Sequence, residues 1–327
     1  MNTARTLASA PTEPGFAEGP HAIGIDVGGT KIAGAIVNLK EGTIAARRQI
    51  ATNHLRGGAA VLADVTALAE DLLAQSARLG MTSRALGVAV AELVDPEGRV
   101  FSDHLIKWKG VDVQALLSNL APTTVEADVR AAALAEARHG AGATFRDFLY
   151  VSIGTGVSGA LVQNGVPYAG SRGAALVIAN GATRHHCLTC GHISTSIVED
   201  VASGPGIAKA FGPNETGQTV LAAAEAGDAT AIRLIDHATE ELGRVIALLV
   251  NSLDPAAVIL GGGLGSAPGR YFESLSRSIR AGLWESDQRP LPILQADFGA
   301  DAAIIGAALS TTLRQEPVDW PCGQSLT

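Results

Sequence analysis

Three apolar stretches of the chain each lead into a glycine-rich turn. They occupy residues 22–37 (AIGIDVGGTKIAGAIV), 149–162 (LYVSIGTGVSGALV) and 256–265 (AAVILGGGLG). The first two are apolar on both sides of their glycines, a pattern typical of two strands joined by a tight hairpin. The third predicts a buried strand that runs through three glycines into a helix.

Helices and a further strand are predicted between these stretches. Residues 57–80 and 228–255 carry apolar positions at helical spacing, and the second of these helices ends before Pro255. Residues 85–95 predict a strand, and the DPEG sequence at its end is a turn signal. Because a similar hairpin opens each half of the chain, we expect two related α/β domains that face each other across a cleft.

The expected boundaries follow from this organisation. Residues 1–20 predict a disordered tail, since they combine proline, acidic and small polar residues without an apolar core. The N-terminal α/β domain is expected at 21–125 and the C-terminal α/β domain at 126–299. A helix at about 300–314 is expected to pack back on the N-terminal domain.

Composition narrows the class of protein. The 327 residues carry a formal net charge of −8, which argues against a nucleic-acid-binding surface. No apolar run approaches the roughly 18–20 residues needed to cross a bilayer. Three cysteines, two of them in a CxxC, do not suggest a disulfide framework. We therefore expect a cytoplasmic protein that binds neither membranes nor nucleic acid.

The first hairpin combines an acid with a glycine pair. Asp26 stands at a strand end and is followed by Gly28, Gly29, Thr30 and Lys31. Such glycines admit the phosphates of a nucleotide, while the aspartate holds Mg²⁺ through water, and the threonine and lysine add a hydroxyl and a positive charge. An ordinary DxGG hairpin is the alternative. Neither a GxxxxGK[ST] loop nor a GxGxxG that opens a helix occurs.

Five motifs taken together resemble the ROK family of sugar kinases and sugar-responsive repressors. IGIDVGGTK, VEADVRAAALAE, YVSIGTGVSGALV, VEDVASGPGI and VILGGGLG occur in the order and spacing of that family, over about residues 21–312. The resemblance implies two actin-like (ribonuclease H-like) α/β domains flanking a nucleotide and substrate cleft, with Mg²⁺ and ATP as cofactors. It assigns phosphate and nucleotide contacts to three glycine segments: Gly28, Gly29, Thr30 and Lys31; Gly154, Thr155 and Gly156; Gly261, Gly262 and Gly263.

The candidate catalytic base is Asp128, which stands between the predicted strand TTVEA and an alanine-rich helix. Phosphoryl transfer needs a carboxylate that orients the acceptor hydroxyl and takes its proton. Kinases of the ROK family usually read N-D-x-N here, and this chain has Ala127 and Arg130 in place of the two asparagines. A helix N-cap is the alternative role for Asp128.

The residues expected to contact the substrate depart from the glucose-type pattern. The family segment GEIGH aligns with residues 176–180, so that Val177 and Asn180 replace its glutamate and histidine. Losing a buried acid removes affinity for hydroxyls and lets an apolar ring edge fit. Glu92 and His104 are the candidate replacements, against the alternative that both are solvated loop residues. The full set of expected substrate-binding residues is Glu92, His104, Asp128, Arg130, Val177, Asn180 and Glu199.

These departures indicate an ATP-dependent kinase that phosphorylates the terminal CH₂OH group of a sugar-like molecule other than glucose. A C7-cyclitol of the valiolone type is favoured, as in pathways of antibiotic biosynthesis. An amino sugar or hexose (kanosamine, glucose or N-acetylmannosamine) and a catalytically silent sugar sensor are the alternatives. A repressor would need a DNA-binding domain before the first hairpin, where only about twenty residues stand. By resemblance, we expect a homodimer that binds ATP, ADP and a small polyol.

The segment GATRHHCLTCGH (181–192) concentrates histidines and cysteines. Many ROK proteins bind a structural zinc through a histidine and three cysteines near here. In this chain, a set drawn from Cys187, Cys190, His192 and His186 (or His185) is stereochemically compatible with zinc. Two free thiols beside exposed histidines are the alternative, and a catalytic zinc is not expected because Mg²⁺ serves phosphoryl transfer.

Overall fold

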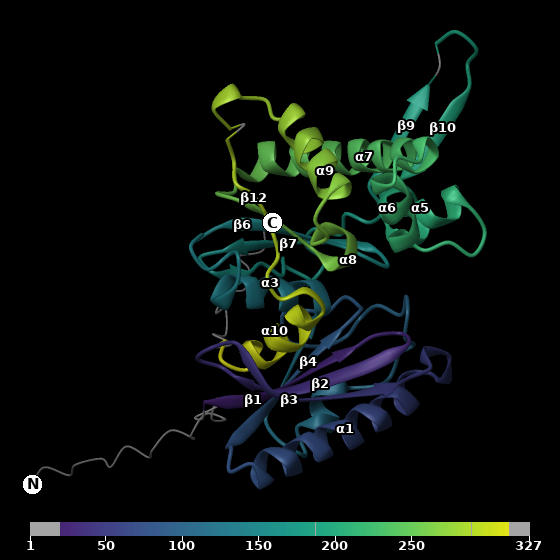
Figure 1. The fold of residues 1–327 in the computed structure, drawn as a ribbon. Coiled ribbons are helices and arrows are strands. Elements are labelled where there is room, and N and C mark those ends of the chain that lie inside the picture. Colours follow the sequence, from purple (N-terminus) through teal and green to yellow (C-terminus); the bar gives the residue numbers. More distant parts are fainter. Residues whose placement is uncertain (1–19, 187, 289, 314–327) are drawn as a thin grey trace, which may run out of the picture.

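The computed structural model describes residues 20–186, 188–288 and 290–313. Figure 1 shows two α/β domains, one above the other, with helical segments between them. The tail predicted over residues 1–20 lies outside the described residues except for Pro20, and so does the chain after Leu313. Within the described residues, no helix is long and apolar enough to span a bilayer.

The N-terminal domain is built on a five-stranded sheet in the order β3-β2-β1-β4-β5. β1 pairs antiparallel with β2 and parallel with β4, and β4 pairs parallel with β5. α1 covers one face, burying the apolar positions that predicted it. The bounds are β1 (His21–Val27), β2 (Lys31–Asn38), β3 (Thr43–Ala51), η1 (His54–Arg56), α1 (Gly58–Arg78), β4 (Ser83–Val90), α2 (Val113–Leu117) and β5 (Thr123–Ala127).

The strand predicted over 85–95 ends at Val90 in the structure. Val90 is the last residue of β4 that pairs with β5, opposite Ala127. Beyond it the chain leaves the sheet, and Leu93 donates its backbone N–H to the Ser102 hydroxyl at 2.8 Å. The residues after Val90 therefore belong to a loop that folds on itself, which hydropathy alone does not distinguish from a strand.

The sheet of the C-terminal domain repeats the same plan, in the order β12-β11-β6-β7-β8. β6 pairs antiparallel with β7 and parallel with β11, and β11 pairs parallel with β12. Each domain thus begins with a hairpin and adds parallel strands beside its first strand, as the repeated sequence pattern predicts. The bounds are β6 (Phe148–Ile153), β7 (Val157–Gln163), β8 (Val166–Pro167), β11 (Val258–Gly261) and β12 (Ile293–Gln295).

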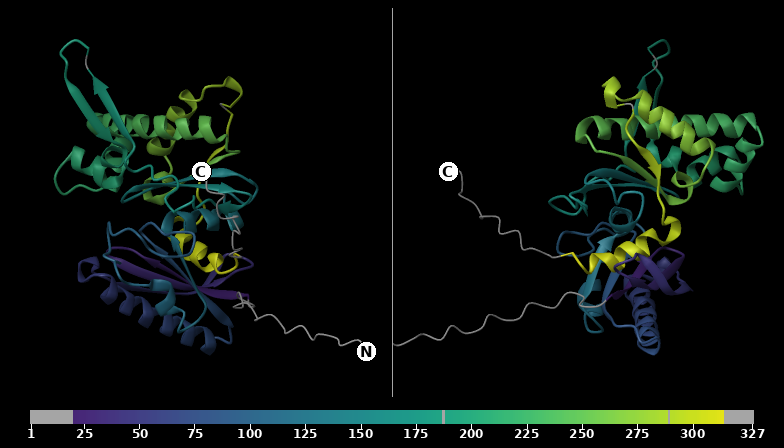
Figure 2. Two further views of the ribbon diagram at one scale, coloured as in Figure 1. Left: turned by 180° about the vertical axis from the view of Figure 1, so that it is seen from behind. Right: turned by 60° about the vertical axis from the view of Figure 1, so that its left-hand side comes forward.

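Helices cover this second sheet, and a separate two-stranded hairpin projects from the same domain. α7 begins at Ala229, where the Asp228 side chain accepts N–H bonds from Thr230 and Ala231, and it ends before the left-handed Asp254. The hairpin β9–β10 extends away from the body in all three views (Figures 1 and 2). The bounds are β9 (Ala182–His186), β10 (Ile193–Ile197), α4 (Val198–Ala202), α5 (Gly204–Phe211), α6 (Gly217–Glu225), α7 (Ala229–Leu253), α8 (Gly262–Gly265), α9 (Arg270–Ala281) and η2 (Ser286–Gln288).

Two helices lie between the sheets: α3 (Asp128–His139) and, after η3 (Gly299–Asp301), α10 (Ala302–Ser310). Glycines allow close contact here. A Cβ atom at Gly306 would lie 1.6 Å from the Ala131 carbonyl oxygen, and one at Gly87 would lie 1.7 Å from that of Ala307. α10 therefore packs directly on both α3 and the N-terminal sheet, and α3 brings Asp128 to the space between the domains.

Candidate active site

The first glycine turn, between β1 and β2, is fixed by hydrogen bonds from its own domain. The Gly28 N–H donates to the Lys31 carbonyl oxygen at 3.0 Å, which closes the turn. The Gly29 carbonyl oxygen lies 2.9 Å from Nδ1 of His54 and accepts the backbone N–H of that histidine at 3.3 Å. Thr30 and Lys31 are exposed. The turn therefore presents its hydroxyl and its ammonium group to solvent on a fixed backbone.

The second glycine turn, between β6 and β7, lies beside the glycines that follow β11. Gly154 donates its N–H to the Gly156 carbonyl oxygen at 2.9 Å, and a Cβ atom at Gly154 would lie 3.6 Å from the backbone nitrogen of Gly263. Gly262 has a φ of 76°, and a Cβ atom there would lie 2.5 Å from the Ile153 carbonyl oxygen. Only glycine fits at such a position. Two predicted nucleotide segments thus meet in the C-terminal domain.

A small cavity of about 110 Å³ joins the two domains at their acidic residues. Asp26 from β1 and Asp128 from α3 both line it, together with Gly262 and the serines Ser152 and Ser158. Among the described residues, neither a lysine nor an arginine lines this cavity. Two carboxylates that share a cavity with no basic side chain can attract a divalent cation, and phosphate and water would supply most of its ligands. Asp26 is therefore compatible with the predicted role in Mg²⁺ binding.

Burial raises the pKa values of both acids, and the charge of Asp26 adds to the rise at Asp128. Burial raises the pKa of Asp26 to about 6, against the smaller opposing effects of Lys31 and Arg47. Burial, and then the charge of Asp26, raises the pKa of Asp128 to about 7. A carboxyl group with a pKa near the working pH is suited to accept a proton from an alcohol.

The raised pKa values of Asp26 and Asp128 predict that the stability of the ligand-free protein depends on pH. An acid whose pKa is raised by folding stabilises the fold while it is protonated, and this contribution is lost as pH rises through 6 and 7. We expect the melting temperature to fall by about 3–5 °C between about pH 5 and pH 8, and to fall less in Asp26→Asn. Asp71→Asn, which changes an exposed acid on α1, is the control. An identical pH dependence in wild type and Asp26→Asn would contradict the prediction.

A larger cavity of about 570 Å³ adjoins the small one and shares with it Asp128, Val129, Ser152 and Ser158. Its two sides come from different domains. Residues 91–105 contribute what we call the N-terminal wall, and residues 173–179 contribute the C-terminal wall. Asp128 therefore stands where the two cavities meet.

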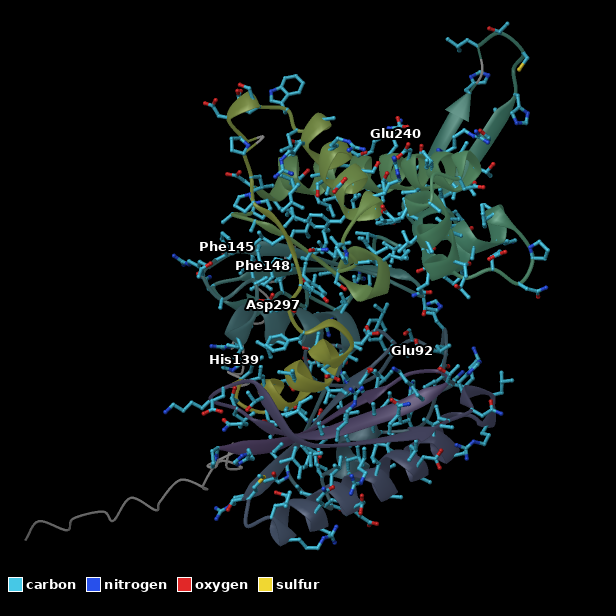
Figure 3. All side chains as sticks on the ribbon, viewed as in Figure 1. Glu92, His139, Phe145, Phe148, Glu240 and Asp297 are labelled. Carbon is cyan, nitrogen blue, oxygen red and sulfur yellow. The ribbon has the colours of Figure 1, made fainter. Side chains whose placement is uncertain are left out.

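Glu92 lies in the N-terminal wall, on the side of its domain that faces the C-terminal domain (Figure 3). Its carboxylate accepts backbone N–H bonds from His104 at 3.0 Å, Leu105 at 2.6 Å and Ile106 at 3.0 Å, and a hydrogen bond from the Ser102 hydroxyl. These donors occupy both carboxylate oxygens. Glu92 thus shapes the wall, while His104 is exposed and also lines the cavity.

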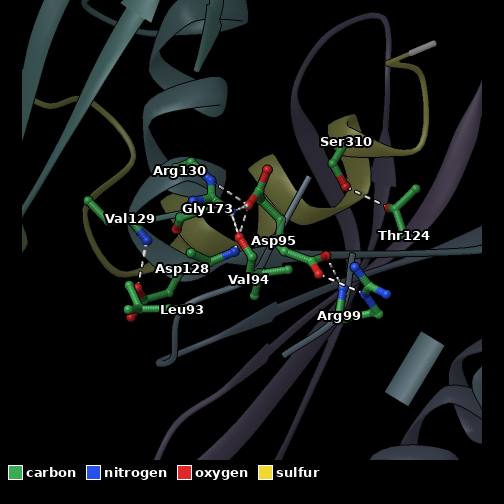
Figure 4. Close-up of polar contacts among 12 residues, drawn as sticks. Leu93, Val94, Asp95, Arg99, Thr124, Asp128, Val129, Arg130, Gly173 and Ser310 are labelled. Carbon is green, nitrogen blue, oxygen red and sulfur yellow. Dashed lines mark hydrogen bonds and ion pairs between the residues drawn. The ribbon is translucent and has the colours of Figure 1, made fainter. Parts of the chain in front are cut away.

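Arg130 is buried at the start of α3, with a side chain that is 5% exposed. Its guanidinium donates to Glu126 and to the carbonyl oxygens of Val94 and Gly173 (Figure 4). Arg130 lines the cavity, but the two terminal nitrogens of its guanidinium donate to backbone carbonyl oxygens of the two walls. The substrate contact predicted for it stays a prediction.

The C-terminal wall is apolar at the positions that align with the family's acid. Val177 is 50% exposed and lines the cavity beside Leu176 and Ile178. Asn180 is exposed and does not appear among the lining residues. Glu199 lines the cavity, and its Oε2 accepts the N–H of Val157 at 2.9 Å, which supports the second glycine turn. The structure thus brings Val177 and Glu199 to the site and leaves Asn180 outside it.

Asp128 is the first residue of α3, and Ala127 holds the N-cap position without a side-chain bond. Oδ1 of Asp128 accepts the N–H of Val129 at 2.6 Å. Asp128 is therefore not the N-cap residue of α3. Its carboxylate accepts the adjacent amide instead, and Asp128 lines both cavities.

Sequence reasoning missed two serines at the junction of the cavities. Ser152 and Ser158 pair directly across the β6–β7 hairpin and line both cavities beside Asp128. The signal was present in SIGTGVS, because residues that pair across a hairpin point to the same face. Two serines placed symmetrically about the glycine turn therefore had to share one side of the sheet.

Three of the predicted zinc ligands lie on the projecting hairpin. His186, Cys190 and His192 are exposed near its end. Cys187 lies outside the described residues, as does the side chain of His185. Within the described part of the chain, no three His, Cys, Asp or Glu side chains come together as a metal site. The zinc site stays a prediction.

Comparison with known proteins gives a consistent result. The chain matches the ROK family over residues 22–312. It is 28% identical over 311 residues to a glucokinase of Halalkalibacterium halodurans, covering 87% of this chain and 92% of that relative. It is 31% identical over 294 residues to an N-acetylmannosamine kinase of Escherichia coli O127:H6, covering 88% and 97%.

A solved structure shows the same likeness. A ROK family glucokinase from Streptomyces griseus, in complex with glucose and AMPPNP, has a TM-score of 0.72 and 26% identity, over 88% of this chain and 98% of that one. The likeness confirms the predicted fold of two actin-like α/β domains. The chain belongs to the ROK family.

Proposed function

We propose that this protein transfers the γ-phosphoryl group of ATP to the hydroxyl of a small sugar-like molecule held in the large cavity. It is an ATP-dependent phosphotransferase with an alcohol group as acceptor, in the class of the kinases to which it is similar. The observation that carries the proposal is the position of Asp128 between two adjoining cavities, one with Asp26 and Gly262, the other with the two acceptor walls.

The chemistry follows from this arrangement. Asp128 accepts the proton of the acceptor hydroxyl while the hydroxyl oxygen forms a bond to the γ-phosphorus and the bond to ADP breaks. The glycine turns offer backbone N–H groups to the phosphates without side chains in the way. When bound, Mg²⁺ neutralises charge on the phosphates, and Asp26 would hold it through water.

The apolar C-terminal wall favours an acceptor with few hydroxyls on one edge. A hydroxyl that faces Val177 would lose its bonds to water and gain no partner from that side chain. Glu92, the predicted replacement for the missing acid, already accepts four hydrogen bonds from the protein, which leaves its carboxylate little capacity for a hydroxyl of the acceptor. A carbocyclic C7-cyclitol of the valiolone type, phosphorylated on its terminal CH₂OH, fits these demands better than glucose.

Two alternatives remain, and the names of the relatives favour the first of them. A hexose or amino-sugar kinase (glucose, N-acetylmannosamine or kanosamine) is favoured by the relatives, which are named for glucose and N-acetylmannosamine. A silent sugar sensor would keep the cavity without turnover. A homodimer, a structural zinc on the β9–β10 hairpin, a cytoplasmic location and a role in antibiotic biosynthesis stay predictions.

A coupled assay of ADP release decides between these functions. Purified protein with Mg²⁺-ATP is tested against a valiolone-type cyclitol, kanosamine, glucose and N-acetylmannosamine, with an acceptor-free sample as control. We expect the highest kcat/KM for the cyclitol, by about 10-fold or more over glucose. Binding of an acceptor without any turnover would contradict the kinase and favour the sensor.

A further inference from the structure

The two walls of the large cavity meet at one buried cation. Arg130 Nε donates to Oε1 of Glu126 at 2.6 Å, Nη2 donates to the Val94 carbonyl oxygen at 2.6 Å, and Nη1 donates to the Gly173 carbonyl oxygen at 2.9 Å. Figure 4 shows Arg130 together with Val94 and Gly173. A single guanidinium therefore holds one residue of each wall, since Val94 belongs to the N-terminal wall and Gly173 to the C-terminal wall.

The walls also touch each other at this point. Gly173 is buried with a φ of 77°, and a Cβ atom there would lie 2.0 Å from the Val94 carbonyl oxygen. Any side chain at this position would push the two walls apart. Two features thus hold the walls together at this point. The Arg130 guanidinium bonds to both walls, and the absence of a side chain at Gly173 lets them approach closely.

Each wall is also anchored within its own domain. The N-terminal wall is fixed by Glu92, as described above. The C-terminal wall is tied at its far end, where the Ala179 carbonyl oxygen accepts the N–H of Glu199 at 3.1 Å. Neither of these anchors crosses between the walls, whereas the contact at Arg130 and Gly173 joins one wall to the other.

We propose that Arg130 is a positioning residue that locks the two acceptor walls together before the acceptor binds, in place of contacts that a sugar's hydroxyls would make across the cleft. The inference rests on the proposed function, because it assigns the large cavity to the acceptor. A rigid fork is suited to this task, since it reaches two carbonyls at once, whereas an ammonium group is a point donor. Pre-formed walls lower the ordering cost of acceptor binding.

The test begins with hydrogen exchange, which needs no turnover. Arg130→Lys keeps a positive charge beside Glu126 and loses the fork, and Gly173→Ala opens the same contact from the other wall. In both variants we expect the peptides that contain residues 91–105 and 168–180 to exchange about 10-fold faster or more, together, while α1 is unchanged. Arg99→Lys is the matched control, because the exposed Arg99 makes an ion pair with Asp95 within the N-terminal wall itself.

Kinetics then separate positioning from simple stability. We expect the KM for the acceptor to rise about 10-fold or more in Arg130→Lys, with the KM for ATP within about twofold of wild type. In Arg130→Ala, added guanidinium at millimolar concentration should restore part of the acceptor affinity, and ammonium should not. If Arg130→Ala does not fold, the lysine variant carries the test.

Three results would overturn the proposal. Faster exchange in only one wall would show that Arg130 does not join them. If both walls exchange faster but the KM for the acceptor is unchanged, the contact at Arg130 stabilises the fold and does not position the acceptor. Equal increases in the KM for acceptor and ATP would indicate a general defect. If wild type phosphorylates no acceptor, the proposed function fails, and the exchange measurement alone still decides whether Arg130 joins the walls.

Discussion

Asp128→Asn is expected to lower kcat by about 10²–10⁴-fold while leaving the dissociation constant for ATP within about threefold of wild type. The amide has nearly the shape of the carboxylate, and its oxygen still accepts the N–H of Val129, which Asp128 Oδ1 accepts at 2.6 Å. It cannot take the proton of the acceptor hydroxyl. Steady-state kinetics and isothermal titration with a nucleotide analogue measure the two effects separately.

Stability provides a second readout of the same variant. Because burial and the charge of Asp26 raise the pKa of Asp128, the charged carboxylate destabilises the fold at about pH 8. The asparagine variant should therefore melt about 2–5 °C above wild type there, although it is inactive. Asp112→Asn is the matched control, since Asp112 caps α2 by accepting the N–H of Ala115 at 2.9 Å and asparagine caps equally well. Normal turnover in Asp128→Asn would refute the assigned base.

The core of each domain was predictable from one hairpin pattern that occurs twice in the sequence. The hairpin stretches 22–37 and 149–162 each become the first two strands of a sheet, and the two sheets have the same order. This was predictable because alternation of apolar runs with glycine turns specifies hairpins locally. The end of the strand predicted over 85–95 was not, since it depends on where β5 stops pairing and on the bond from Leu93 to Ser102.

The site was predictable where chemistry depends on local sequence. Asp26 and the first glycine turn were singled out because phosphate binding needs an acid and glycines at such spacing. Asp128 and the other two glycine segments were singled out because their motifs resemble those of the ROK family. The wall residues were harder, since the role of a polar side chain depends on which distant donors meet it. Glu92 stands ten residues before Ser102 and Arg130 lies 43 residues before Gly173, so no spacing rule joins these partners. Both proved to bind the protein's own walls.

Val177→Glu is expected to shift acceptor preference toward glucose by about 10–100-fold in the ratio of kcat/KM values for glucose and cyclitol. The new carboxylate would accept hydrogen bonds from sugar hydroxyls that the valine leaves without a partner. Val177 is 50% exposed and lines the cavity, so the longer side chain has room to enter it. A carbocycle whose apolar edge faces this wall would instead lose affinity, because the carboxylate would be desolvated without a partner. The coupled assay with both acceptors measures the ratio.

Two matched variants separate the effect of the position of the new side chain from the effect of its charge. Ser171→Glu adds the same acid on an exposed residue of the same segment, outside the set that lines the cavity, and should leave the ratio unchanged. Val177→Gln supplies hydrogen-bonding capacity without charge and should give a smaller shift in the same direction. Asn180 needs no change, because it does not line the cavity. An equal shift in Ser171→Glu would attribute the effect to electrostatics at a distance, and no shift in Val177→Glu would refute the apolar wall as the determinant of acceptor choice.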